Sequence, residues 1–447
     1  MLVRFAVQNF RSFSEQTGIS MVANGRIRRM EDHVVTCGDL KLLRGAFVYG
    51  ANASGKSNLI RAVDFATKIV DLGSTDAVNF YDQYCKLNKE AVDQSGVFQF
   101  DILIDNRVYS YGFALSYRDG RVVEEWLYNL GASGSEFCYF ARDERGHVRT
   151  DLNLRGESRK RFEVYRGDVK ALQSGLFLAE MAKKPEHEDF RVFRQVHEWF
   201  KRVIVIFPES VYRPLPLVVR DKKRKRQLEA CLTHFDTGID SIGVHPTTLE
   251  NELGSATAKR LREKLRAQLA DKEEYVYRDR RVLLVVRREK DELKVGKLRL
   301  NHKDAVEPFN FVEESCGTKR LFDLIPLFFD DLGDCIVFID ELDRSLHPRL
   351  TVEFVNLFYR FTQGRNLQMI VTTHESALLD LNLIRQDEIW LVERLPTGST
   401  LYSLNDFKVR FDKQIEKDYL LGRFGAVPFF SSNYVSEEGE EYGDPQT

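Results

Sequence analysis

The sequence predicts an α/β fold with a mixed or parallel core sheet, an antiparallel β-subdomain and a small helical insertion. Three observations lead to this prediction. A short apolar strand at 44–49 runs into a glycine-rich loop, and a helical pattern follows at 57–69. A second apolar strand, at 335–339, ends in two carboxylates. Residues 97–128 alternate apolar and polar side chains and turn twice, which is typical of an antiparallel meander.

The composition is that of a large globular chain. Its 447 residues are 43% hydrophobic and 30% charged, and the net charge is −2. A chain of this length has room for two or three domains. No run approaches the roughly 18 apolar residues that a membrane-spanning helix needs, and the first residues lack the apolar stretch of a signal peptide. We therefore expect a cytoplasmic protein with no membrane partner.

The glycine-rich loop Gly50–Ser57 reads GANASGKS and matches the phosphate-loop pattern GxxxxGK[ST]. Glycines let backbone amides turn toward phosphate oxygens, and the helix N-terminus adds partial positive charge. We expect Lys56 to reach the β- and γ-phosphates of ATP and to act in catalysis, and Ser57 to bind Mg²⁺. The other loop residues expected to hold the nucleotide are Gly50, Asn52, Ala53, Ser54, Gly55 and Asn58.

The strand at 335–339 is followed by Asp340 and Glu341. We expect Asp340 to hold Mg²⁺ through water, and Glu341 to orient and deprotonate the water that attacks the γ-phosphate. The structural alternative for Glu341 is a helix cap. Because a phosphate loop precedes these carboxylates in the same chain, the catalytic interpretation is favoured.

Two further motifs have both a functional and a structural interpretation. Val371–His374 is a buried strand ending in a histidine, and His374 would contact the γ-phosphate or be merely structural. Ser315, Gly317 and Thr318 open a helix whose N-terminus would be a second phosphate site or an ordinary capped end. One phosphate cannot lie on two helix N-termini on opposite sides of one subunit. We therefore predict that Ser315 and Gly317 reach a nucleotide held by a neighbouring subunit.

Residues 211–300 carry eight more basic than acidic side chains, including the run Lys222–Arg226. A solvated helix face would explain this excess, and so would contact with the phosphates of a nucleic acid. A helix is predicted at 256–270, and the segment has room for one short helical pair at most. The last residues, 431–447, are acidic with almost no aliphatic side chains, which predicts a disordered tail.

Together these motifs resemble the ABC/SMC/RecF class of ATPase heads. The closer resemblance is to OLD-like bacterial ATPases of anti-phage abortive-infection systems, including the ATPase subunits of PARIS and AbiL-type systems. It rests on the segments NFRSF (9–13), GANASGKSN (50–58), ESCGTKRLFDL (314–324), FIDELDRSLHP (338–348), TTHES (372–376) and DEIWLVE (387–393).

The resemblance implies a nucleotide-sandwich dimer or a higher oligomer. Its two-subunit site would combine Lys56, Ser57, Asp340, Glu341 and His374 of one subunit with Ser315, Gly317 and Thr318 of another, and Arg11 would lie near the nucleotide. Two departures stand out. SCGTK replaces the LSGGQ signature of transporters, and His347 stands where transporters have a signalling aspartate. A glutamine loop is not assigned, and Gln83 and Gln173 are its candidates.

The resemblance also implies an organisation and a role. Residues 1–210 and 301–430 would form the two parts of the ATPase head, separated by the basic insertion 211–300 and followed by the tail. We expect an ATPase subunit of an anti-phage defence system that assembles with ATP, responds to a phage trigger protein and controls a separate toxic effector such as a nuclease. The alternative is a RecF- or SMC-like DNA-binding ATPase in repair or recombination, with nucleic acid bound by the insertion.

Overall fold

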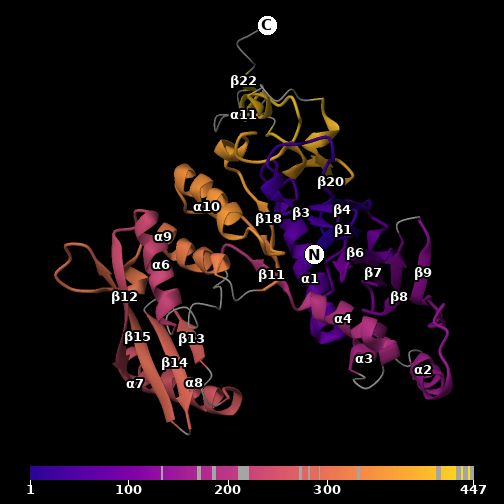
Figure 1. Ribbon diagram of the computed structural model, residues 1–447, viewed down its shortest axis with the longest axis horizontal. Helices are drawn as coiled ribbons and strands as arrows, with labels where there is room; N and C mark the ends of the chain where they lie inside the picture. The colour runs from indigo at the N-terminus through magenta and orange to yellow at the C-terminus, as the bar shows by residue number, and fades with distance from the viewer. Residues whose placement is uncertain are drawn as a thin grey trace. The chain divides into compact units, whose positions relative to one another are not determined.

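The computed structural model divides the chain into two compact units. The first comprises 1–205, 334–341 and 366–447, and the second 206–333 and 342–365 (Figure 1). The structure describes residues 1–131, 134–168, 173–183, 188–209, 221–270, 274–279, 282–290, 292–329, 333–408, 414–428, 434–435 and 441–442.

The core of the first unit is a six-stranded sheet with the order β11-β17-β18-β5-β19-β20. Its four central strands pair in parallel, and β20 adds an antiparallel edge, so the predicted mixed core sheet is confirmed. Residues of β5, β17 and β18 are buried throughout, as expected for strands covered on both faces. The strands are β5 (Gly45–Tyr49), β11 (Val203–Ile206), β17 (Ile336–Ile339), β18 (Gln368–Thr372), β19 (Ile389–Leu395) and β20 (Gly398–Ser403).

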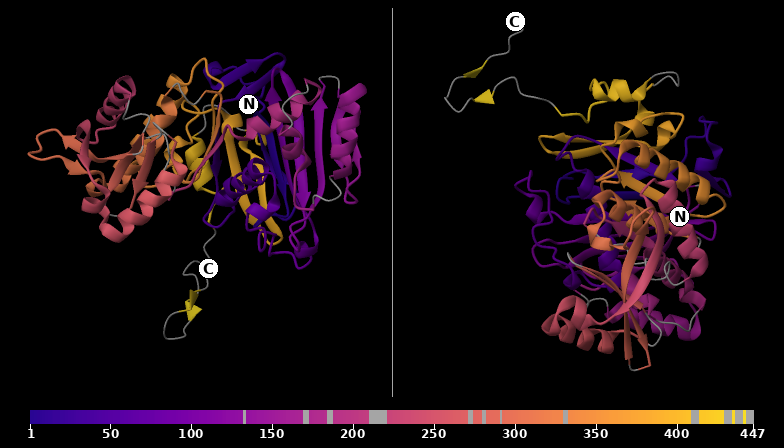
Figure 2. Two further views of the ribbon diagram at one scale, coloured as in Figure 1. Left: turned by 90° about the horizontal axis from the view of Figure 1, so that it is seen from below. Right: turned by 90° about the vertical axis from the view of Figure 1, so that its left-hand side faces the viewer.

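A seven-stranded antiparallel sheet forms the β-subdomain of the same unit, with the order β10-β9-β8-β7-β6-β1-β2 (Figure 2). The meander predicted at 97–128 is confirmed, and its first turn lies at Asp105–Asn106, where both residues have positive φ. The side chain of Gln368 on the core sheet exchanges two hydrogen bonds with the backbone of Leu2, so it ties the two sheets together. The strands are β1 (Leu2–Gln8), β2 (Thr17–Ser20), β6 (Gly96–Ile104), β7 (Arg107–Leu115), β8 (Val122–Leu130), β9 (Glu136–Arg142) and β10 (Val148–Arg149).

Helix α1 (Lys56–Leu72) follows strand β5 and buries one apolar side, including Leu59, Ile60 and Val63 as predicted. The remaining elements of this unit are the hairpin β3 (Val34–Cys37) and β4 (Leu40–Leu43), and the helices α2 (Gly156–Asp168), α3 (Phe177–Ala182), α4 (Arg191–Phe200) and α11 (Ile415–Leu420).

The second unit contains an antiparallel sheet of order β12-β15-β14-β13, with β16 paired to β15. The predicted helix at 256–270 is confirmed as α8, but the expectation of a small helical insertion was incomplete because it missed this sheet. Between 296 and 300, strand β15 alternates the buried Gly296, Leu298 and Leu300 with the half-buried Lys297 and Arg299, so this period of two places these two charges on one face of the strand. The elements are β12 (Ile239–Thr247), β13 (Glu274–Arg278), β14 (Leu283–Glu289), β15 (Glu292–His302), β16 (Phe309–Asn310), α6 (Lys222–His234), α7 (Leu249–Leu253), α8 (Ser255–Gln268), α9 (Cys316–Leu324) and α10 (Pro348–Phe361).

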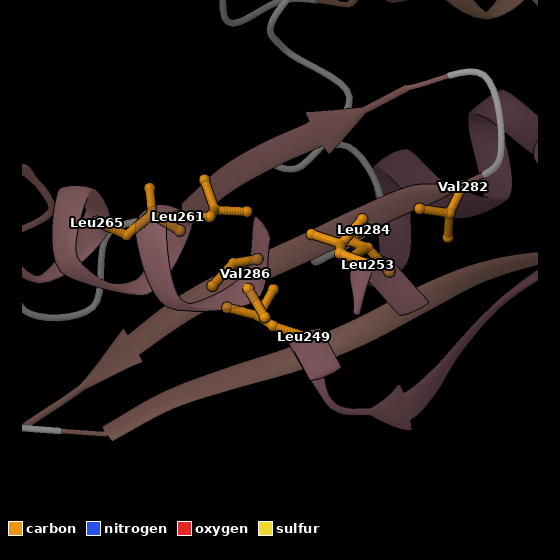
Figure 3. Close-up of a cluster of buried hydrophobic side chains, with 8 residues drawn as sticks. Leu249, Leu253, Leu261, Leu265, Val282, Leu284 and Val286 are labelled. Carbon is orange, nitrogen blue, oxygen red and sulfur yellow. The ribbon is translucent and has the colours of Figure 1, made fainter. Parts of the chain in front are cut away.

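A hydrophobic cluster gives this second sheet a core of its own. Figure 3 shows side chains of α7 and α8 directed at strand β14. Burial of these aliphatic groups stabilises the unit by about 25 cal/mol per Å² of apolar surface removed from water. The buried members are Leu249, Leu253, Ala258, Leu261, Leu265, Val282, Leu284 and Val286.

The tail predicted to be disordered, 431–447, lies outside the described residues except for two paired strands. These are β21 (Tyr434–Val435) and β22 (Glu441–Tyr442), which the sequence did not predict. Among the helices of the described residues, none has the length and apolar character needed to cross a membrane.

Candidate functional site

The phosphate loop leaves the N-terminus of α1 without a side-chain cap. The helix begins at Lys56, and the preceding Gly55 has a φ of 115°, a conformation that favours glycine. A Cβ at Gly55 would stand 2.6 Å from the Ser399 hydroxyl and 2.7 Å from the Ser12 hydroxyl, so a larger residue does not fit. Because no side chain of the described residues caps this end, the first-turn amides suit an anionic ligand.

A cavity of about 690 Å³ lies on this end of the first unit. It is lined by most of the predicted nucleotide-binding residues together with Glu341, His374 and Arg11, which come from distant parts of the sequence. Parallel strands explain this convergence, because β5, β17 and β18 all end at the same edge of the core sheet. The predicted site residues on its wall are Arg11, Asn52, Ala53, Ser54, Gly55, Lys56, Ser57, Asn58, Glu341 and His374.

The Lys56 ammonium folds back on its own loop. Its Nζ donates hydrogen bonds to the carbonyls of Gly50 (2.8 Å) and Ala51 (3.0 Å). The side chain of Asn58 instead reaches out of the helix and donates to the Ser12 hydroxyl at 2.9 Å. Lys56 is therefore placed to exchange carbonyl partners for phosphate oxygens, whereas Asn58 connects α1 to the NFRSF segment.

Thr372 organises the two carboxylates that follow β17. Its hydroxyl donates to Asp340 Oδ1 at 2.6 Å and accepts from the amide of Glu341 at 2.8 Å. Asp340 is buried, while Glu341 is half-buried with a φ of 50°, an uncommon conformation for a residue with a Cβ. The sequence placed Thr372 within the TTHES motif but gave it no role. Its two hydrogen bonds therefore fix both the buried Asp340 side chain and the backbone of Glu341, whose side chain lies on the cavity wall.

Ser57 and Asp340 fit a Mg²⁺ ion by the chemistry of their donors. Mg²⁺ prefers oxygen ligands, and it commonly takes one or two protein ligands together with phosphate and water oxygens. Within the described ranges, no group of three or more His, Cys, Asp or Glu side chains could hold a metal. A Mg²⁺ ion at Ser57 and Asp340 would therefore depend on the nucleotide for its remaining ligands.

Arg11 lies on the cavity wall and is held by Gln83. The amide of Arg11 donates to the Gln83 carbonyl at 2.6 Å, and its Nε donates to Gln83 Oε1 at 2.9 Å. Burial and the neighbouring Arg61 guanidinium lower the pKa of Arg11. The second glutamine-loop candidate, Gln173, accepts a backbone hydrogen bond from Val122 in the β-subdomain, and neither Gln83 nor Gln173 is among the residues on the cavity wall.

The predicted signature residues lie in the second unit at the start of α9. The Ser315 hydroxyl caps this helix by accepting from the amide of Thr318 at 3.0 Å, and the two hydroxyls are 2.9 Å apart. A Cβ on Gly317 would stand 2.6 Å from the carbonyl of Ser345, so glycine is needed for packing. His347, which replaces the aspartate of transporters, caps α10 through the amide of Arg349.

A family model described as "AAA domain, putative AbiEii toxin, Type IV TA system" matches residues 46–166 and 217–380. The chain belongs to this AAA-domain family. The matched ranges contain the phosphate loop, both carboxylates of the β17 end and His374, and the fold is that of a phosphate-loop ATPase. No curated protein matches the chain.

Three solved structures similar to this AAA-domain protein are SMC heads. One is an SMC head bound to the C-winged helix domain of ScpA (11% identity, TM-score 0.41, 90% of this chain and 97% of that one). Another is the SMC head domain from Thermotoga maritima (11% identity, TM-score 0.34, 90% of this chain and 98% of that one). The third is an SMC head domain with an extended coiled coil, bound to the C-terminal domain of ScpA derived from Pyrococcus furiosus (14% identity, TM-score 0.37, 91% of this chain and 97% of that one).

Sequence reasoning missed several residues on the cavity wall of this AAA-domain protein. Arg61 stands one helical turn beyond Ser57, so the periodicity of α1 could have identified it. Arg394 follows the DEIWLVE motif on β19, which pairs with β5 beside the phosphate loop. Ser12 lies in the NFRSF motif beside the predicted Arg11. The remaining members, Asp82, Tyr84, Lys86 and Leu87, belong to one loop with no recognisable pattern, and only tertiary contacts bring them to the cavity.

Proposed function

We propose that this protein binds and hydrolyses ATP, and that binding drives its assembly into a dimer or a larger oligomer. One observation carries the proposal. The uncapped start of α1, Lys56, Glu341 and His374 share a single cavity, although these residues lie far apart in the sequence. This combination suits phosphoryl transfer, in which the protein positions the phosphates and stabilises the charge that develops on them.

Each residue has a role that its position supports. Lys56 would bind the β- and γ-phosphates, helped by the amides at the start of α1. Glu341 would orient and deprotonate the attacking water, and His374 would contact the γ-phosphate from the end of β18. Ser57 and Asp340 would hold Mg²⁺, which when bound neutralises charge on the phosphate oxygens. Arg11 would lie against the phosphate chain.

Assembly would complete the site. Ser315, Gly317 and Thr318 of a second copy would bind the γ-phosphate held by the first copy. In support, α9 begins with an exposed Ser315 hydroxyl beside a glycine, and its N-terminus carries partial positive charge. ATP would then stabilise the assembled state selectively, because only that state provides both halves of the site.

The biological role that we propose is in bacterial defence against phage. The description of the matching family names a putative AbiEii toxin and a type IV toxin–antitoxin system, which agrees with the resemblance to abortive-infection ATPases. The ATP-bound assembly would hold a separate effector, such as a nuclease, inactive until a phage component changes the assembly. Co-purification with the product of the adjacent gene tests this role. Recovery of a partner with wild-type protein but not with a Lys56→Ala variant supports the role, and recovery of none contradicts it.

The Glu341→Gln variant tests the catalytic proposal. It should bind ATP as wild type does, lose hydrolysis by on the order of 10²-fold or more, and remain assembled with ATP. Phosphate release measures turnover, and analytical ultracentrifugation measures assembly. Glu353→Gln, which changes a half-exposed carboxylate 2.7 Å from His234 on the second unit, is the control. Turnover that survives in Glu341→Gln would refute the role of this residue.

A DNA-binding ATPase is the second candidate, and the solvent face of α8 favours it. This helix buries Ala258, Leu261 and Leu265 and exposes Lys259 and Lys264. Among the described residues, neither of these lysines is in an ion pair. By contrast, the run Lys222–Arg226 at the start of α6 is partly compensated, because Arg224 pairs with Asp221 and Lys225 with Glu229.

The two basic segments can be compared directly. If the protein binds duplex DNA, the affinity should fall steeply with salt, and Lys259→Glu with Lys264→Glu should weaken it more than Arg224→Glu with Lys225→Glu, because Arg224 and Lys225 already have acidic partners. Fluorescence anisotropy over a salt series measures both effects. The absence of DNA binding at low salt would eliminate this candidate.

A further inference from the structure

Part of the wall of the nucleotide cavity comes from the loop 82–87, which follows helix α1 in the chain. Asp82, Tyr84, Lys86 and Leu87 of this loop line the same cavity as Lys56 and Glu341. We propose that Tyr84 is the stacking surface for the purine base of the bound nucleotide and thereby contributes to nucleotide selectivity. This inference rests on the proposed function, because it concerns the remainder of the same ligand.

The composition of the wall indicates where the base lies. The start of α1 and the carboxylate edge of the core sheet fix the position of the phosphates. Most of the other wall residues are charged or polar, and these suit phosphates and a ribose. Among the described residues on the wall, Tyr84 is the only Phe, Tyr or Trp and Leu87 the only large aliphatic side chain. A purine presents two flat apolar faces that need such contacts, so the base is expected at the 82–87 loop.

Tertiary hydrogen bonds on both sides of Tyr84 hold the loop in place. The amide of Cys85 donates to Asn9 Oδ1 at 3.0 Å, and Gln83 accepts from Arg11 through both its carbonyl and its side chain. Asn9 is itself buried, and its side-chain amide donates to two further carbonyls at 91 and 94. The NFRSF segment therefore fixes the backbone beside the aromatic ring. Little loop ordering would remain to oppose binding.

The ring of Tyr84 is also supported from within the protein. Its centroid lies 6.1 Å from that of Tyr117 at an interplanar angle of 57°, and the buried Tyr117 hydroxyl donates to the Asn9 carbonyl at 2.6 Å. Lys86 Nζ lies 6.0 Å from the centroid of the Tyr84 ring and 3.5 Å from Asp82. Tyr84 itself is half-exposed, so part of its surface is accessible to a ligand.

Two ligands separate a role in base binding from a role in phosphate binding. Calorimetric titrations of wild type and Tyr84→Ala with Mg-ATP and with Mg-tripolyphosphate measure the two contributions. Loss of a stacked base should weaken ATP binding about 5- to 150-fold, and tripolyphosphate binding should be unchanged. Tyr84→Phe should restore ATP affinity because it keeps the ring. Repeating the titrations with Mg-GTP and Mg-CTP shows whether the preference between bases depends on Tyr84.

A neighbouring tyrosine provides the matched control. Tyr81 is 57% exposed on the same loop, packs against Phe80 and is not on the cavity wall, so Tyr81→Ala should bind ATP as wild type does. The inference is overturned if Tyr84→Ala binds ATP normally, or if its affinity for tripolyphosphate falls as much as its affinity for ATP. A wild-type protein that binds neither ligand would instead refute the proposed function, and this inference with it.

Discussion

The N-termini of α1 and α9 were both predicted to be phosphate sites, but they differ in whether a side chain caps the helix. At α1, no side chain of the described residues caps the helix, and a left-handed Gly55 opens the loop before it. At α9, Ser315 caps the helix by accepting from the amide of Thr318. A helix end without a cap depends on a ligand to satisfy its amides, whereas a capped end is already stable.

A third helix start in the same protein supports this distinction. At α3, the carboxylate of Glu125 accepts hydrogen bonds from the amides of Phe177 (2.6 Å) and Leu178 (2.9 Å). Here the protein supplies its own anion, and Glu125 is completely buried. Of these three helix starts, α1 therefore depends most on an external phosphate. The α9 N-terminus is already capped, so its proposed contact with the γ-phosphate of a second copy would add to the site without being needed to complete the helix.

The largest effect is expected at α1. Lys56→Ala should weaken ATP binding by on the order of 10²-fold or more, because it removes a charge-assisted contact to the phosphates. Titration with ATP by calorimetry measures the loss. Lys68→Ala is a matched control, since Lys68 lies on the exposed side of the same helix and pairs with Asp64 at 2.7 Å. Equal affinities for the two variants would show that the uncapped helix start is not the nucleotide site.

A smaller effect on binding but a clear effect on assembly is expected at α9. Ser315→Arg should leave ATP binding intact, abolish ATP-dependent assembly and reduce turnover about 10²-fold. Ser315→Asp sharpens the test, because aspartate is an equally good helix cap but would repel a phosphate. Sedimentation with and without ATP and phosphate release are the measurements.

The capping role of Ser315 predicts a different pattern. If Ser315 is only a cap, then Ser315→Asp would assemble and turn over ATP as wild type does. Ser315→Ala would then lose about 1 kcal/mol of stability against urea without any effect that depends on ATP. This result would assign α9 a purely structural role and would refute the two-subunit site.

The smallest effect concerns pH dependence at α3. Burial raises the pKa of Glu125 above its ordinary value, although the amides of Leu178 and Phe177 oppose this shift. The folded state therefore holds the proton more tightly than the unfolded state does. The stability contributed by this group is complete below the ordinary glutamate pKa and is lost as pH rises through the higher folded-state pKa.

Urea unfolding between pH 4 and 7 tests this sign. Wild type should lose more stability than Glu125→Gln as the pH rises, even though the variant is less stable overall because it weakens the α3 cap. Glu124→Gln, at the exposed neighbouring position, is the matched control. If Glu125→Gln and wild type lose the same stability with rising pH, Glu125 does not titrate as its burial indicates.

Much of the fold could be predicted because its signals are local. The α1 pattern, the apolar strands before Asp340 and His374, and the alternation at 97–128 each depend on periodicity within a few residues. The sheet of the second unit was missed because its strands lie in the basic segment 211–300, for which only helices were predicted. The alternation of Leu298 and Leu300 with Lys297 and Arg299 on β15 becomes meaningful only when one face of the strand is buried.

Local sequence motifs alone predict the chemistry proposed for the phosphate loop and the carboxylate edge of the core sheet. Lys56, Ser57, Asp340, Glu341 and His374 could be named because each follows a buried strand in a recognisable motif. The surroundings of these residues, by contrast, depend on how the chain folds. Tyr84 and its loop are held at the cavity by a hydrogen bond from the amide of Cys85 to Asn9 and by one from Arg11 to Gln83, and the capped state of the helix N-termini also appears only in the folded protein. These features depend on contacts between residues far apart in the chain, and no local pattern encodes them.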